Sequence, residues 1–139
     1  MPINPQQAQV VVVEDNADNL FIATDLLRAV VKVHYCNGRA SGRQLFKLLE
    51  SKPTLQLDLI LLDIQIPHED GYTVLQQIRR HPRLQDTVVV AVTANVMPQD
   101  VDRARGAGFD GFIGKPISAR CFPQQVERIL AGDAVWEPR

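Results

Sequence analysis

The sequence is poor in the features of disulfide-rich and membrane-inserted proteins. It contains two cysteines, Cys36 and Cys121, among 139 residues, and their wide separation provides neither a disulfide framework nor the spacing of a metal site. No apolar run approaches the roughly 18 residues of a membrane-spanning helix, and the N-terminal MPINPQQAQ has neither a basic region nor an apolar signal core. These absences predict a cytoplasmic protein with free thiols.

An excess of charge of one sign is also lacking, since the formal net charge is −1 at pH 7. A value this close to zero gives no electrostatic reason to expect binding to nucleic acid or to an anionic membrane. Small basic clusters such as Arg79, Arg80 and Arg83 are interpreted as solvated helix surface. The length corresponds to one domain, and a hydrophobic fraction of 45% is ordinary for a chain with a buried core.

The hydrophobic pattern alternates between continuous apolar runs and segments of helical period. The runs predict buried strands, at 10–14, 31–36, 57–64, 87–95 and 109–114. The periodic segments predict helices, at 15–30, 38–52, 70–82, 98–106 and 118–130. Strict alternation of this kind predicts an α/β fold, with a five-stranded parallel sheet and helices on both faces. Residues 9–131 form the predicted domain, between loose tails at 1–8 and 132–139.

Polar residues gather where the predicted strands end. The segment LILLDIQIPHEDG (59–71) runs from apolar residues straight into Asp63, although burying an unpaired carboxylate costs several kcal/mol. Four other polar residues also follow strands: Glu14, Asp15, Thr93 and Lys115. Because ligands bind beyond the carboxyl ends of parallel strands, these five side chains predict one shared site.

The composition of this predicted site indicates phosphoryl transfer. Three neighbouring carboxylates repel one another, and a divalent cation relieves the repulsion. Oxygen ligands without histidine or cysteine favour Mg²⁺ or Mn²⁺ over zinc. Lys115 and Thr93 can bind oxygens of a phosphoryl group, and the lone carboxylate, Asp63, has room to act as a nucleophile.

The same residues carry a family resemblance. The segments VVVEDN (11–16), LILLDIQIPHEDG (59–71), AVTAN (91–95) and GFIGKPI (111–117), in this order, resemble the receiver domain of two-component response regulators. The likeness extends over about residues 9–131 and is closest in kind to the stand-alone, chemotaxis-regulator-like receivers. It implies a flavodoxin-like sheet with the strand order 2-1-3-4-5.

The resemblance also implies a phosphoacceptor and a metal site. Asp63 would accept a phosphoryl group from a phosphohistidine of a sensor histidine kinase or a histidine phosphotransfer protein. Asp15, Asp63 and the backbone carbonyl of Gln65 would bind Mg²⁺ directly, and Glu14 would act mainly through a bound water. The domain would not be an enzyme in the ordinary sense, although it would catalyse its own phosphotransfer and its own slow dephosphorylation.

Other residues would convert phosphorylation into a signal. By the resemblance, Lys115 bridges to the phosphoryl group, Thr93 swings toward it, and Phe112 turns inward into the vacated space. That motion would switch the face made by the fourth helix, fifth strand and fifth helix for partner binding. Gln65 and Asn95 would flank the approach of water and tune the lifetime of the phosphorylated state. We expect a monomer or weak dimer; the sequence identifies no output partner.

Departures and alternatives bear on this interpretation. Phe112 lacks the hydroxyl of the commoner tyrosine, and Glu69 makes its loop more polar than is usual in the family.

A phosphatase of the haloacid dehalogenase type would need an acid two residues after Asp63, where Gln65 stands. A flavin-binding module would need a phosphate loop in place of the acidic EDNADN (14–19). A degenerate receiver is disfavoured by the intact set of site residues. A receiver excised from a hybrid histidine kinase or multidomain response regulator remains the alternative architecture.

Overall fold

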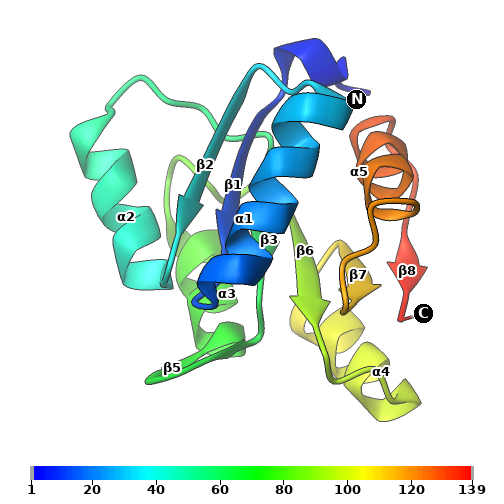
Figure 1. The fold of residues 1–139 in the computed structure, drawn as a ribbon. Helices are drawn as coiled ribbons and strands as arrows, with labels where there is room; N and C mark the ends of the chain where they lie inside the picture. The colour runs from blue at the N-terminus through cyan, green and yellow to red at the C-terminus, as the bar shows by residue number, and fades with distance from the viewer. Residues whose placement is uncertain (1, 139) are drawn as a thin grey trace.

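The computed structural model describes residues 2–138, which form a six-stranded parallel sheet between two layers of helices (Figure 1). The strands, in spatial order, are β2 (Tyr35–Arg39), β1 (Gln9–Val13), β3 (Leu59–Leu62), β6 (Val88–Thr93), β7 (Gly111–Gly114) and β8 (Trp136–Glu137). Every neighbouring pair in this sheet is parallel. The first five strands have the predicted order 2-1-3-4-5, and the predicted α/β fold is confirmed.

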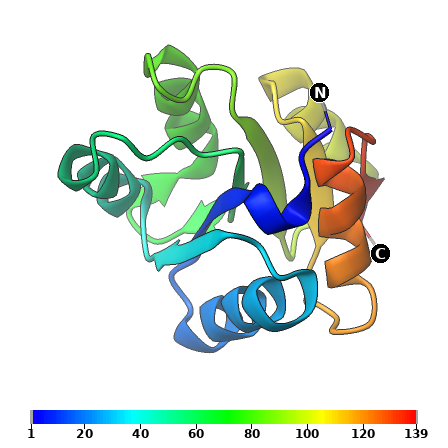
Figure 2. The same ribbon diagram turned by 90° about the horizontal axis from the view of Figure 1, so that it is seen from above.

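Five helices cover the two faces of the sheet. They are α1 (Ala17–Leu26), α2 (Gly42–Ser51), α3 (Gly71–Arg80), α4 (Pro98–Ala107) and α5 (Phe122–Leu130). Figure 2 shows α1 and α5 on one side of the sheet and α2, α3 and α4 on the other. Side chains of successive strand residues point to opposite faces: Val11 and Val13 join the core under α2–α4, whereas Val10 and Val12 join the core under α1 and α5. Both faces are buried, which explains why the strands are continuous apolar runs.

The second predicted strand is wrong in its position. Residues 27–31 extend α1 as a short π-helix, η2 (Leu27–Val31), and Lys32 then takes a left-handed conformation with φ 63°. Val31 is buried on this helical turn, so its apolar character serves a helix rather than a strand. The strand therefore begins later, at Tyr35.

Two further elements differ from the sequence prediction. A small antiparallel hairpin, β4 (Gln65–Ile66) and β5 (Glu69–Asp70), follows β3. The helix predicted from residue 118 begins at Phe122, with Pro123 in its first turn, where a missing backbone N–H costs nothing. Before it, the Ser118 hydroxyl accepts hydrogen bonds from the backbone N–H groups of Arg120 and Cys121.

The C-terminal region makes the sheet larger than predicted. Trp136 and Glu137 pair with Phe112 and Ile113 of β7, so the expected five strands become six. In the N-terminal region, a 3₁₀ turn, η1 (Pro5–Gln7), precedes β1. The flexibility of the two predicted tails stays a prediction. Within residues 2–138, none of the helices combines the length and apolar composition needed to cross a lipid bilayer.

Candidate functional site

Two buried carboxylates stand at the carboxyl ends of the central strands. Glu14 follows β1 and Asp63 follows β3, and their backbone N–H groups continue the sheet by donating to Arg39 O (2.9 Å) and Val13 O (3.0 Å). The two residues are only 3% and 4% exposed. The hydrogen bonds of the sheet therefore determine the positions of these two acids. This explains why an apolar strand is followed directly by an aspartate.

Lys115 connects the two buried acids. Its ammonium donates a hydrogen bond to Asp63 Oδ2 at 2.9 Å and another to Glu14 Oε1. The second oxygen of each acid accepts a backbone N–H, from Asn16 to Glu14 at 3.0 Å and from Gln65 to Asp63 at 2.9 Å. Burial of these carboxylates is thus compensated by a cation and by backbone donors.

The pKa values of this cluster respond to burial and to the ion pairs. Burial raises the pKa of the Glu14 carboxyl, and the hydrogen bonds from Lys115 and Asn16 offset only part of that rise. Burial alone would lower the pKa of the Lys115 ammonium, but its hydrogen bonds to Glu14 and Asp63 outweigh burial and raise it. Lys115 is therefore held in its charged form.

The pocket has the donor set of a hard-cation site. Glu14, Asp15 and Asp63 each offer a carboxylate oxygen, and these oxygens all lie within 4.8 Å of one another. Asp15 is exposed, which leaves one side of the group open to solvent. A cluster made only of carboxylate oxygens, with an open side where waters can complete the coordination, fits Mg²⁺.

A cleft of about 200 Å³ opens beside this pocket. Gln65, Thr93 and Asn95 line it together with residues of β5, α3 and α4. Thr93 is buried at the end of β6, and its hydroxyl accepts a hydrogen bond from the Asn95 backbone N–H at 3.3 Å. The structure therefore brings the predicted hydroxyl and both predicted flanking amides to one cavity.

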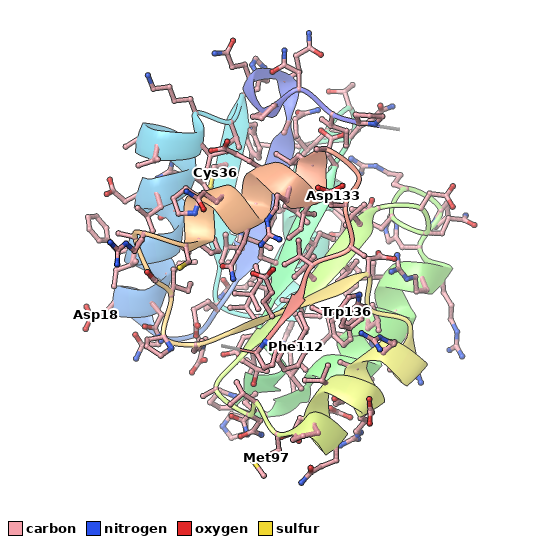
Figure 3. All side chains as sticks on the ribbon, turned by 90° about the vertical axis from the view of Figure 1, so that its right-hand side faces the viewer. Asp18, Cys36, Met97, Phe112, Asp133 and Trp136 are labelled. Carbon is pink, nitrogen blue, oxygen red and sulfur yellow. The ribbon has the colours of Figure 1, made fainter. Side chains whose placement is uncertain are left out.

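Phe112 lies outside the pocket. It is in the middle of β7, fully buried in the core between the sheet and α4, and Trp136 packs against that same core (Figure 3). An inward turn from an exposed position, as the resemblance implies, therefore has no exposed starting point in this structure.

Glu69 is a structural contact that sequence reasoning missed. Its carboxylate accepts hydrogen bonds from the first backbone N–H groups of α2, at Gly42 (2.8 Å) and Arg43 (3.1 Å). The β4–β5 hairpin that follows Asp63 is thereby tied to a helix N-terminus, where a negative charge is favourable. The polar character of PHEDG (67–71) was the only signal in the sequence, because the partner lies 27 residues away.

Fold and pocket together define a class of protein. It is a doubly wound α/β domain that presents three carboxylates, a lysine and a threonine beyond the carboxyl ends of its strands. The family model described as the response regulator receiver domain matches residues 10–127. The chain belongs to this family, and it is a receiver domain of two-component signalling systems. The family resemblance predicted from the sequence is confirmed.

Relatives of several architectures share this domain. The chain is 34% identical to the polar-differentiation response regulator DivK of Brucella ovis, over 90% of this chain and 97% of DivK. It is 38% identical to part of the signal transduction histidine-protein kinase BarA of Escherichia coli K12, over 91% of this chain. The match spans 13% of the length of BarA.

A solved structure supports the same assignment. The receiver domain of a sensor histidine kinase from Pseudomonas aeruginosa PAO1, described with a magnesium ion coordinated in its active site cleft, superposes with a TM-score of 0.72. It is 26% identical, with 91% of this chain and 99% of that chain covered. Receiver domains are signalling domains that interact with histidine kinases or histidine phosphotransfer proteins.

Proposed function

We propose that Asp63 is the phosphoacceptor of this receiver. The observation that carries the proposal is the placement of Asp63: a buried carboxylate at a strand end, in contact with Lys115 and within 4.8 Å of the oxygens of Glu14 and Asp15. Of the three acids, Asp63 is the one that has both the lysine and the cleft of Gln65, Thr93 and Asn95 beside its strand end.

The transfer itself exchanges one bond to phosphorus for another. An oxygen of the Asp63 carboxylate attacks the phosphorus of a phosphohistidine in line with the P–N bond. The O–P bond forms, the P–N bond breaks, and the imidazole nitrogen keeps that electron pair. Lys115 binds one oxygen of the transferred group and the Thr93 hydroxyl donates to another, so both neutralise charge where it accumulates.

Mg²⁺ fits the same scheme. Glu14, Asp15 and Asp63 are the side chains that would hold it, and the Gln65 carbonyl is the proposed backbone ligand. When bound, Mg²⁺ offsets the repulsion between the carboxylates and the incoming phosphoryl group. Lys115 offsets part of the same repulsion, since it pairs with Glu14 and Asp63.

The surface beside the pocket supports a protein as phosphodonor. Phe21 and Ile22 lie on α1, shortly after Glu14 and Asp15 in the chain, and their residues are 67% and 41% exposed. A histidine that reaches Asp63 must belong to a partner that contacts this rim. We infer that an apolar surface of a sensor histidine kinase or a histidine phosphotransfer protein packs on α1.

The test of the acceptor is phosphorylation by acetyl phosphate with Mg²⁺, followed by intact mass. We expect the wild-type protein to gain one phosphoryl group and Asp63→Asn to gain none, because an amide is not a competent nucleophile. Asp18→Asn, an exposed position on α1, is the matched control and should be phosphorylated normally. A phosphoryl adduct on folded Asp63→Asn protein would refute the assignment.

The lifetime of the phosphorylated state is a second part of the proposal. Water must attack phosphorus opposite the Asp63 oxygen, releasing inorganic phosphate and the free carboxylate. Gln65 and Asn95 line the cleft beside Thr93, and neither amide is a base, so we expect an intermediate lifetime. Gln65→Arg or Asn95→Tyr should slow phosphate release by obstructing the water. Unchanged rates in both variants, with an altered rate in Lys115→Ala, would assign the lifetime to the charged residues instead.

A further inference from the structure

The outer edge of the sheet is occupied by a segment of the same chain. Residues 133–138, the C-terminal segment, run along β7 between α5 and α4, as the positions of Asp133 and Trp136 in Figure 3 show. This is the face of α4, β7 and α5 that the family resemblance assigns to output. Whatever contacts this face must meet the C-terminal segment first.

Backbone contacts place the segment tightly on β7. Phe112 N–H donates to Val135 O at 2.8 Å, and Trp136 and Glu137 continue the parallel pairing. Two glycines of β7 make the approach possible. A Cβ at Gly111 would lie 2.7 Å from Val135 O, and one at Gly114 would collide with Pro138 O. The absence of side chains at these two positions is what admits the added strand.

Side chains fasten the segment to both helices of the face. The Arg105 guanidinium of α4 lies over the Trp136 ring at 4.5 Å. On the other side, Arg128 of α5 donates to both carboxylate oxygens of Glu137 at 2.6 and 2.7 Å, and Gln125 donates to the same carboxylate at 3.1 Å. The Arg128 bond lowers the pKa of Glu137, so this carboxylate is charged at neutral pH.

The segment also touches the chain that leads to the pocket. Gly114, against which Pro138 packs, directly precedes Lys115, whose ammonium binds Asp63. Phe112, which pairs with Trp136, lies two residues earlier in the same strand. Lys115 therefore directly follows the strand on which the segment rests.

We propose that residues 133–138 close the α4–β7–α5 face as a resident strand, and that phosphorylation of Asp63 releases them and opens the face to a partner. The release rests on the function proposed above. The physical reason is that Lys115 exchanges its bonds to Glu14 and Asp63 for the phosphoryl oxygens, which moves the carboxyl end of β7. Val135 is buried, but the rest of the segment is half-buried or exposed, and its ion pair with Arg128 is partly open to solvent. Such a short, partly exposed element is suited to opening locally.

Trp136 is the single tryptophan of the sequence, so its fluorescence reports the segment without a label. In the unmodified protein we expect Trp136 to be shielded from acrylamide. The double variant Arg105→Ala, Arg128→Ala should raise the quenching constant toward that of free N-acetyltryptophanamide and shift emission to the red. Arg120→Ala, an exposed arginine just before α5, is the control and should change neither. Quenching of the wild type as strong as that of free N-acetyltryptophanamide would overturn the resident strand, and equal quenching in the double variant and the wild type would overturn the role of the two arginines in holding it.

Phosphorylation tests the release. The protein is treated with acetyl phosphate and Mg²⁺, the adduct is counted by intact mass, and quenching is measured on the same sample. We expect quenching to rise in wild type and to stay constant in Asp63→Asn. A phosphorylated protein with unchanged quenching would overturn the release and leave the proposed function intact. A protein without the adduct would overturn the proposed function and, with it, the release, whereas the arginine variants would still decide the docking.

Discussion

Two carboxylate–cation clusters in this molecule have similar contact distances and opposite surroundings. In the pocket, Lys115 Nζ lies 2.9 Å from Asp63, and the two side chains are 14% and 6% exposed. At the outer edge, Arg128 lies 2.6 Å from Glu137, with 44% and 35% exposure. A buried ion that loses its partner keeps its desolvation cost, whereas an exposed one is solvated and screened. Contact distance alone therefore does not show which of the two clusters contributes more to stability.

The pKa shifts of Glu14 in the pocket and Glu137 at the outer edge distinguish the two clusters in the same way. Burial dominates at Glu14 and raises its pKa, despite the lysine beside it. Hydrogen bonds from Arg128 and Gln125 dominate at Glu137 and lower its pKa. In the pocket, burial thus disfavours the ionised form of Glu14. At the outer edge, hydrogen bonds favour the ionised form of Glu137. The buried cluster of the pocket suits a site that must bind further charged groups. The partly exposed cluster at the outer edge suits a contact that can open.

The largest expected effect is that of Lys115→Ala on stability. Removing the cation leaves Glu14 and Asp63 buried and facing each other, which should lower the free energy of unfolding by about 3 kcal/mol. Because the oxygens of the acidic cluster suit a divalent cation, Mg²⁺ should restore part of the loss in the variant. Urea unfolding with and without Mg²⁺ measures both. A variant as stable as the wild type would mean that the buried acids do not need Lys115.

An intermediate effect is expected for Glu69→Ala. The change removes the acceptor of two N-terminal N–H groups of α2, so we expect a loss of about 1 kcal/mol, the usual cost of a lost helix cap. Glu50→Ala, an exposed position on the same helix, provides the control. Equal midpoints of thermal unfolding for the two variants would show that the contact between the hairpin and α2 adds no stability.

The smallest effect on stability is expected for Arg128→Ala. The ion pair is partly exposed, so the free energy of unfolding should fall by less than about 1 kcal/mol, even though the contact to Glu137 is shorter than the contact of Lys115 to Asp63. Thermal unfolding beside Lys115→Ala tests the comparison directly. If Arg128→Ala were the more destabilising of the two, burial would not be what separates these clusters.

The sequence predicted those features of the fold that depend on a local pattern of residues. Continuous apolar runs identified most strands, and an acid directly after a run identified Glu14 and Asp63, because a parallel sheet collects its strand ends at one edge. The same reasoning misplaced β2. The residues VKVHYC (31–36) have strand-like composition, but Val31 is buried as part of the last turn of a helix.

The basic residues show the limit of such reasoning most clearly. Arg83, interpreted from the sequence as solvated surface, instead donates to the carbonyls of Leu49, Lys52 and Leu55 at 2.6–2.8 Å. Arg79, interpreted in the same way, pairs with Asp110 at 2.7 Å. These partners lie 28 or more residues away in the chain, so no spacing or periodicity identifies them.

The sequence by itself determined the class of fold and the rim on which the polar residues meet, because side-chain period and strand ends are local properties of a chain. Only the tertiary structure decided which cation neutralises which acid, that Glu69 accepts hydrogen bonds from the first N–H groups of α2, and that Trp136 and Glu137 pair with β7. Each of these contacts joins segments that are brought together by packing. Their geometry depends on how the layers meet, and glycines such as Gly111 and Gly114 acquire their role only when another backbone approaches them.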